Sequence, residues 1–93
     1  MIECRDGRCT LRGPITVANV VALLADGDRI LTAPEVTVDL AGVTEVDSAA
    51  VSLLLEWRRQ ATRRGGTIQF VNLPDNLTSL ARLYGVTELL SPT

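Results

Sequence analysis

The segment from Val36 to Trp57 constrains the fold of this chain more than any other. It opens with Val36 to Leu40, a run rich in β-branched residues that suits a strand. Residues 41–45 then predict a short loop, and Asp47-Ser48 stands immediately before an apolar run with helical spacing. Because Asp and Ser are favoured at helix N-termini, we expect a helix to begin there. A serine at such an electropositive helix end can be a simple cap, a phosphate acceptor or a docking contact.

Length and composition predict one small folded domain over residues 1–93. A chain of 93 residues is long enough for one core and too short for two. Hydrophobic residues make up 46% of it and aromatic residues 3%, so the core should be aliphatic. The net charge of −2 argues against nucleic acid as a partner, because nucleic-acid binding requires a basic surface. Basic side chains do cluster at one predicted helix end, where they complement the helix dipole: Arg58, Arg59, Arg63 and Arg64.

We expect a cytoplasmic protein with no direct membrane insertion. No segment approaches the roughly 20 apolar residues that a spanning helix needs. Residues 1–6 also lack the apolar core of a signal peptide.

The two cysteines lie on either side of a strong hairpin signal, Asp6-Gly7. A two-residue turn there makes Cys4 oppose Cys9. A disulfide is geometrically possible in that register. A reducing cytoplasm favours two thiols instead, so we expect the reduced pair. With no histidine in the chain, the cysteines predict no zinc site.

The hairpin strands should cover Ile2 to Cys4 and Arg8 to Arg12, since Gly13-Pro14 cannot continue the ladder. Thr16 is a plausible N-cap for a first helix that continues past Gly27 as a soft point and ends before Pro34. Its apolar face is predicted to carry Val17, Val20, Val21 and Leu24.

The second helix should run from Ser48 to Arg63, followed by the stop signal Gly65-Gly66. Its inward face is predicted to carry Ala50, Leu53, Leu54, Trp57 and Ala61. Thr67 to Val71 forms the next strand, and a third helix from Asn76 to Tyr84 is closed by Gly85. The apolar stripe of that helix comprises Leu77, Leu80, Ala81 and Tyr84, and Leu89 and Leu90 suit a short terminal turn. The order β-β-α-β-α-β-α predicts an α/β fold, a mixed sheet with helices layered on it.

Catalysis is not expected. The chain contains no histidine to serve as the usual general base, and no Gly-x-Ser-x-Gly elbow surrounds Ser48 or Ser52. It also contains no lysine, so a phosphate-binding P-loop is excluded. Asp39 and Asp47 suit a turn and a helix cap better than an acid–base couple. We therefore predict no catalytic residues, no metal site and no cofactor.

The segment around Asp47 resembles the signature of STAS domains. The resemblance is carried by Val38-Asp39-Leu40, Gly42-Val43-Thr44, Val46-Asp47-Ser48 and the apolar helix that follows. Near the C-terminus, Leu80 to Val86 is similar to the last helix of MlaB-type members. The family contains anti-sigma-factor antagonists, the cytoplasmic domains of sulfate transporters, and MlaB, the small STAS subunit of the bacterial Mla phospholipid ABC transporter. The resemblance covers nearly the whole chain and implies the STAS fold.

The resemblance implies two functions that differ at the start of the second helix. In the antagonists, the regulatory phosphoserine is the second residue after the aspartate, which here is Ala49. In MlaB-type members, the residue directly after the aspartate is a functional threonine, and Ser48 holds that position. This chain departs from both patterns, because Ala49-Ala50-Val51 lacks the usual glycine. Alanine is the better helix former, so the helix start should be stiffer here.

The resemblance therefore implies a non-catalytic STAS subunit that binds and supports or regulates the ATPase subunit of a phospholipid-transporting ABC complex. Such a chain would lie at the inner face of the cell membrane through its partner. An anti-sigma-factor antagonist is the alternative, and self-association is left open. The expected contact residues are Asp47, Ser48, Ala49, Val51 and Ser52, with Ser48 as a possible phosphorylation or switch site.

Overall fold

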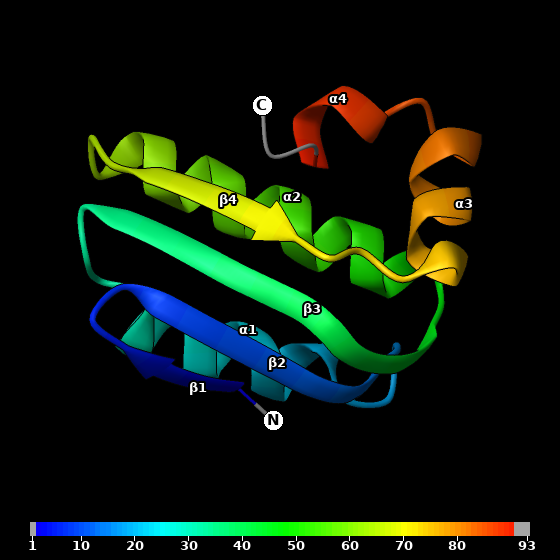
Figure 1. Cartoon of the computed structure of the whole chain (residues 1–93), viewed down its shortest axis with the longest axis horizontal. Coiled ribbons are helices and arrows are strands. Elements are labelled where there is room, and N and C mark those ends of the chain that lie inside the picture. Colours follow the sequence, from blue (N-terminus) through cyan, green and yellow to red (C-terminus); the bar gives the residue numbers. More distant parts are fainter. Residues whose placement is uncertain (1, 91–93) are drawn as a thin grey trace.

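The four strands of this protein form one mixed sheet in the order β1-β2-β3-β4 (Figure 1). A computed structural model describes residues 2–90, except for the side chain of Ile30. The strands are β1 (Ile2–Arg5), β2 (Arg8–Ile15), β3 (Glu35–Val46) and β4 (Thr67–Val71). β1 and β2 pair antiparallel, whereas β2–β3 and β3–β4 are parallel. The predicted mixed α/β sheet is confirmed.

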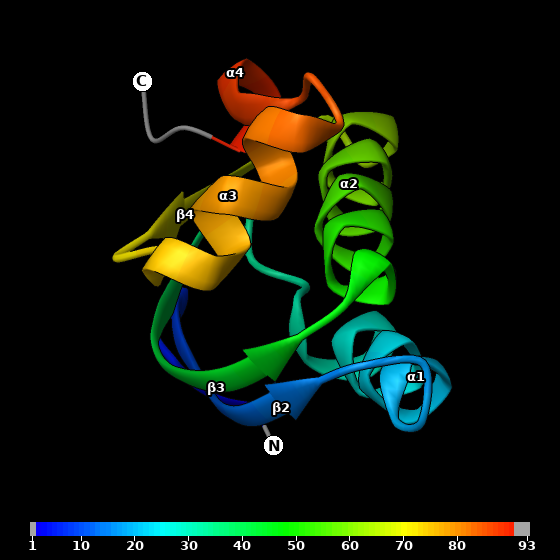
Figure 2. The same ribbon diagram turned by 90° about the vertical axis from the view of Figure 1, so that its right-hand side faces the viewer.

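Each parallel strand pair is joined through a crossover helix, as parallel pairing requires. The helices are α1 (Val20–Ile30), α2 (Ser48–Arg63), α3 (Asp75–Leu83) and the short α4 (Thr87–Leu90). Figure 2 shows α1 and α2 side by side on one side of the sheet, and the two helices are in contact. α2 also contacts β4, α3 and α4, so it is the central helix of the fold.

The β1–β2 hairpin has the predicted register, but the redox state predicted for its cysteines is wrong. Asp6 (φ 53°) and Gly7 (φ 81°) both adopt left-handed backbone, as a type I′ turn requires. Cys4 therefore faces Cys9 directly, and a disulfide joins the two residues. Their Cα atoms are 4.0 Å apart, so the hairpin alone brings the sulfur atoms together. We expected reduced thiols because a cytoplasmic protein lies in a reducing environment, and the fold itself carries no information on that environment.

The two central strands extend further than the sequence predicts. β2 continues through Gly13 and Pro14 to Ile15, and β3 continues through the expected loop at residues 41–45 to Val46. Register shifts in the β2–β3 ladder lie between Thr10 and Arg12 and again between Gly13 and Ile15. These irregularities accommodate the proline and the glycines without ending the pairing.

α1 begins one turn later than predicted, and this changes its buried face. Thr16 is not its N-cap: the Thr16 N–H donates to Asn19 Oδ1 at 2.9 Å, and Asn19 Nδ2 donates to the Pro14 carbonyl at 2.8 Å. These bonds close a separate turn before Val20. The predicted burial of Val17 and Val21 is consequently wrong, because they are 75% and 76% exposed. The residues that pack inward from this helix are Val20, Leu23, Leu24 and Gly27.

Trp57 of α2 lies against Gly27 of α1, and this contact sets how closely the two helices pack. All five predicted inward residues of α2 are buried, and Trp57 is 1% exposed. A Cβ atom at position 27 would collide with the indole ring. The glycine predicted as a soft point therefore lies inside a continuous helix, where it leaves room for the indole. Among the described residues, Trp57 Nε1 has no hydrogen-bond partner, so the ring contributes through packing.

The chain reverses after α3 and places α4 beside α2. Gly85 adopts φ 70°, and the Val86 N–H donates to the Ala81 carbonyl at 2.9 Å, which closes the helix end as predicted. Leu90 of α4 is 1% exposed, so the terminal turn is part of the core. Tyr84, predicted to face inward, is 51% exposed because α3 ends at Leu83.

Replacing Gly27 by Ala should destabilise the protein, although alanine is favoured over glycine in a helix by about 1 kcal/mol. The new methyl group would overlap the indole of Trp57, and overpacking of this kind costs about 1–3 kcal/mol. Urea unfolding monitored by circular dichroism measures the change in the free energy of unfolding. In a Trp57→Phe background, which removes the overlapping part of the ring, the same substitution should be less costly. An equal cost in both backgrounds would contradict this assignment.

Candidate functional site

α2 begins at the residue pair predicted from the sequence, and the aspartate of that pair is its cap. Asp47 has extended backbone (φ −134°, ψ −169°) and is the N-cap. Its Oδ1 accepts a hydrogen bond from the Ala49 N–H at 2.8 Å. Ser48 is the first helical residue and not the cap, and its side chain is exposed. The serine hydroxyl has no hydrogen-bond partner among residues 2–90 and is available to a partner molecule.

Asp47 also connects the start of α2 to the loop before α1. Its second oxygen, Oδ2, accepts from the Val17 N–H at 3.0 Å, across 30 residues of sequence. The Asp47 N–H lies 3.4 Å from the Ile15 carbonyl at the end of β2. One carboxylate thus positions two chain segments that border the same surface.

Three of the five predicted contact residues line one groove. Ser48, Val51 and Ser52 face it from α2, where both serines are exposed and Val51 is buried at its base. Asp47 is engaged in the cap, and half-buried Ala49 lies outside the groove lining. Of the five predicted contact residues, Ser48, Val51 and Ser52 therefore line the groove, whereas Asp47 and Ala49 belong to the helix start beside it.

The other wall of this groove was missed by the sequence analysis. It comprises Leu55 of α2 together with Tyr84 and Val86, which follow α3. Leu55 lies three residues after Ser52, a spacing that places both side chains on one helix face and could have indicated it. Tyr84 caps the end of α3, and the contact of α3 with α2 brings it beside residues that are distant in sequence.

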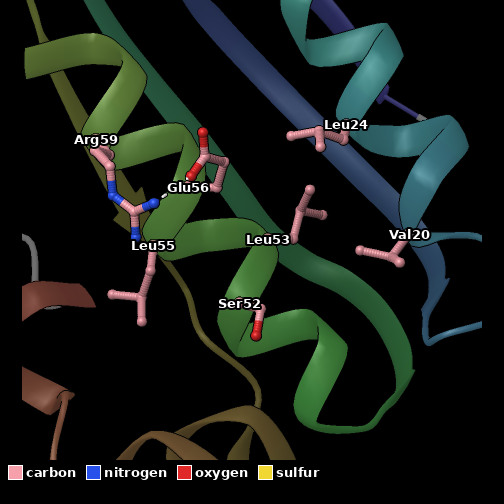
Figure 3. Close-up of a pocket in the computed structure, with 7 residues that line it drawn as sticks. All are labelled: Val20, Leu24, Ser52, Leu53, Leu55, Glu56 and Arg59. Carbon is pink, nitrogen blue, oxygen red and sulfur yellow. Dashed lines mark hydrogen bonds and ion pairs between the residues drawn. The ribbon is translucent and has the colours of Figure 1, made fainter. Parts of the chain in front are cut away.

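A second groove lies between α1 and α2 and shares residues with the first. Figure 3 shows Val20 and Leu24 of α1 pointing toward Leu53 of α2. Ser52 and Leu55 line both grooves. The exposed side of α2 is therefore bordered on both sides by apolar hollows, a form that suits insertion of side chains from another protein.

The carboxylate of Asp39 lies in a separate polar network on the solvent side of the sheet. The Ala41 N–H donates to it at 2.9 Å, Asn72 Nδ2 donates at 3.2 Å, and Arg8 lies 3.7 Å away. The backbone hydrogen bond from Ala41, supported by Asn72 and Arg8, lowers the pKa of Asp39 below its ordinary value. Asp39 and Asp47 have different partners, in keeping with the predicted roles of turn and cap.

Within residues 2–90, no group of three or more metal-ligating side chains is gathered in a metal-binding arrangement. None of the described helices is long and apolar enough to cross a membrane.

Solved structures share this fold. The anti-sigma factor antagonist SpoIIAA in its unphosphorylated form matches with a TM-score of 0.73 and 17% identity, over 95% of this chain and 82% of the other. A crystal structure of Mglu matches with a TM-score of 0.65 and 22% identity over 83% of this chain. This chain corresponds to only 20% of that longer protein. At such identities the likeness is one of fold, and no curated protein matches the sequence.

The fold is that of a STAS domain. A family model described as "Mlab, STAS domain" matches residues 3–91. Because this match covers nearly the whole chain, the protein belongs to the STAS family, in its MlaB-like group. The family resemblance seen in the sequence is confirmed.

Replacing Asp47 by Ala should cost about 1–2 kcal/mol of stability, because the cap to Ala49 is lost and the link to Val17 is lost with it. Replacing neighbouring Ser48 by Ala should change stability by about 0.5 kcal/mol or less, as for an ordinary surface position. Chemical denaturation of the two variants beside the wild type measures this difference. A larger loss for Ser48→Ala than for Asp47→Ala would show that the serine is the true cap.

Proposed function

We propose that this chain is a non-catalytic STAS subunit that binds and supports or regulates the ATPase subunit of a phospholipid-transporting ABC complex. The observation that carries the proposal is the match to the MlaB family model over residues 3–91. The partner would handle ATP and lipid, and it would hold this chain at the inner face of the membrane.

The groove at the start of α2 supports this proposal. Two exposed hydroxyls, those of Ser48 and Ser52, border an apolar lining formed by Val51, Leu55 and Val86. Neither hydroxyl has a hydrogen-bond partner among the described residues. Apolar contacts combined with free polar groups at the border are typical of the protein surfaces that bind other proteins.

Ser48 would also be the position at which the contact is regulated. Its hydroxyl is exposed at the first residue of α2, where the positive end of the helix dipole favours negative charge. A phosphate there would add a charge of about −1.5 to −2. The helix would accept that charge, whereas a partner packed into the groove would not.

An anti-sigma-factor antagonist is the second candidate, and the fold shared with SpoIIAA favours it. Ala49 argues against the phosphorylated form of that mechanism, because it provides no hydroxyl at the position expected from the family pattern. An affinity purification from the native host distinguishes the two candidates. Recovery of a kinase-like anti-sigma factor without an ABC ATPase would reject our first proposal.

Replacing Ser48 by Asp should abolish partner binding while leaving the domain folded. The carboxylate suits a helix N-terminus, but in a packed interface it must shed its water without a matched donor, which costs several kcal/mol. A loss of about 2.7 kcal/mol would already weaken binding about a hundredfold. Calorimetric titration with the host's ABC ATPase subunit, beside thermal unfolding, measures both effects.

Ser79→Asp is the matched control, because Ser79 is exposed on α3 and does not line the groove. It adds the same charge and should leave the affinity within about twofold of the wild type. If Ser48→Asp binds the ATPase as tightly as the control does, the groove at the start of α2 is not the interface.

A further inference from the structure

The C-terminal half of α2 carries a concentrated positive charge. Residues 56–64 contain four arginines and one glutamate, a formal charge of +3 in a chain whose net charge is −2. Glu56 is shared between two of the arginines: it lies 2.6 Å from Arg59 and 3.4 Å from Arg63. Arg58 and Arg64 have no ion pair among the described residues. The cluster is therefore far from neutralised within the chain.

The helix dipole does not account for all of this charge. Favourable interaction of cations with a helix C-terminus is confined to about the last turn. α2 ends at Arg63, so Arg63 and Arg64 fall in that zone. Arg58 and Arg59 lie more than a turn earlier, and Arg58 is half-buried instead of extended into water. Arg59 is paired with Glu56, so Arg58 in particular has neither the helix dipole nor an ion pair among the described residues to account for it.

The arginines border a groove with an apolar centre, between the outer side of α2 and α4. Leu55 is half-buried in it, and Leu89 of α4 is 44% exposed at its edge. The remaining lining residues are Arg58, Arg59, Thr62 and Arg63. One half-buried and one exposed leucine, flanked by guanidinium groups, form an amphipathic cationic surface.

This basic groove is continuous with the groove at the start of α2. Ser48, Ser52, Leu55 and Arg59 follow one another at spacings of four, three and four residues, which places them along a single stripe of the helix. Leu55 lines both grooves. A partner that covers Ser48 and Leu55 therefore needs to extend by only one further turn of α2 to reach Arg59.

We propose that the basic groove binds an acidic amphipathic segment of the protein partner, with apolar side chains over Leu55 and Leu89 and carboxylates paired with Arg58, Arg59 and Arg63. Guanidinium groups bind carboxylates in a two-pronged geometry, and a helix laid in a groove uses such spaced anchors. A flat layer of lipid headgroups would not reach half-buried Leu55 between two helices. The inference rests on the proposed function for the identity of the partner, but the chemistry of the segment follows from the groove.

The direct test uses a synthetic helical peptide with leucine on one face and glutamate on the other, together with its glutamine counterpart. Both are titrated into the 15N-labelled chain and followed by NMR. We expect the glutamate peptide to shift signals around Leu55, Arg58 and Leu89, and to bind more weakly as salt is raised. The glutamine peptide should bind at least tenfold more weakly.

The Arg58→Glu/Arg63→Glu variant should lose at least tenfold in affinity for the glutamate peptide. Its matched control is Arg5→Glu/Arg82→Glu, which reverses two exposed arginines outside the groove and should bind within twofold of the wild type. Thermal unfolding of both variants verifies that each is folded. Equal binding of the two peptides, or equal loss in both variants, would overturn the inference.

Two further arms separate this inference from the other proposals. Phosphatidylglycerol vesicles that bind through Arg58 and Arg63, when the glutamate peptide does not, would assign the groove to a membrane surface and overturn the inference. The Arg58→Glu/Arg63→Glu variant should bind the host's ABC ATPase subunit at least tenfold more weakly than the wild type, and this loss should be larger at low salt. If the ATPase binds the wild type and the Arg58→Glu/Arg63→Glu variant equally, the inference that an acidic segment occupies the basic groove is overturned, while the proposed function stands.

Discussion

The packing of Trp57 on Gly27 is the contact on which the surface of this protein depends. It holds α1 against the inner side of α2, and α2 in turn contacts β4, α3 and α4. The outer side of the same helix carries Ser48, Leu55 and Arg59. Because these contacts fix the helix, its outer stripe is already ordered, and the binding proposed there would cost less ordering entropy. The hydrogen bonds of Asp47 add a second fixed point at the start of the stripe.

The parts of the structure that local sequence signals determine could be predicted. The Asp6-Gly7 turn specified the hairpin register, because two residues with positive φ define which positions oppose each other. The apolar period of α2 identified its buried face, including Trp57. The aspartate–serine pair located the start of that helix. In each case the signal and the structure that it predicts lie within a few residues of each other.

The parts that were missed depend on contacts between distant segments. β3 continues past Gly42 because β2 remains paired with it, and no local pattern reveals that partner. The start of α1 is delayed by a side-chain bond from Asn19 to the end of β2. Tyr84 lines its groove because α3 packs against α2, and Leu89 lines the other because the chain reverses at Gly85 and places α4 beside α2. The arginines of α2 were visible in the sequence, but not Leu89, which α4 places across the groove from them.

Methyl NMR of the chain in complex with the host's ABC ATPase subunit tests the central claim most directly, because methyl groups report on side-chain contacts across the whole surface. The claim is that the outer stripe of α2 and the segment after α3 form the interface. The account predicts large shifts for the methyl groups of Leu55, Val86 and Leu89 and little change for Val71, which points to the opposite side of the sheet. Large shifts at Val71 with unchanged signals at Leu55 would contradict it.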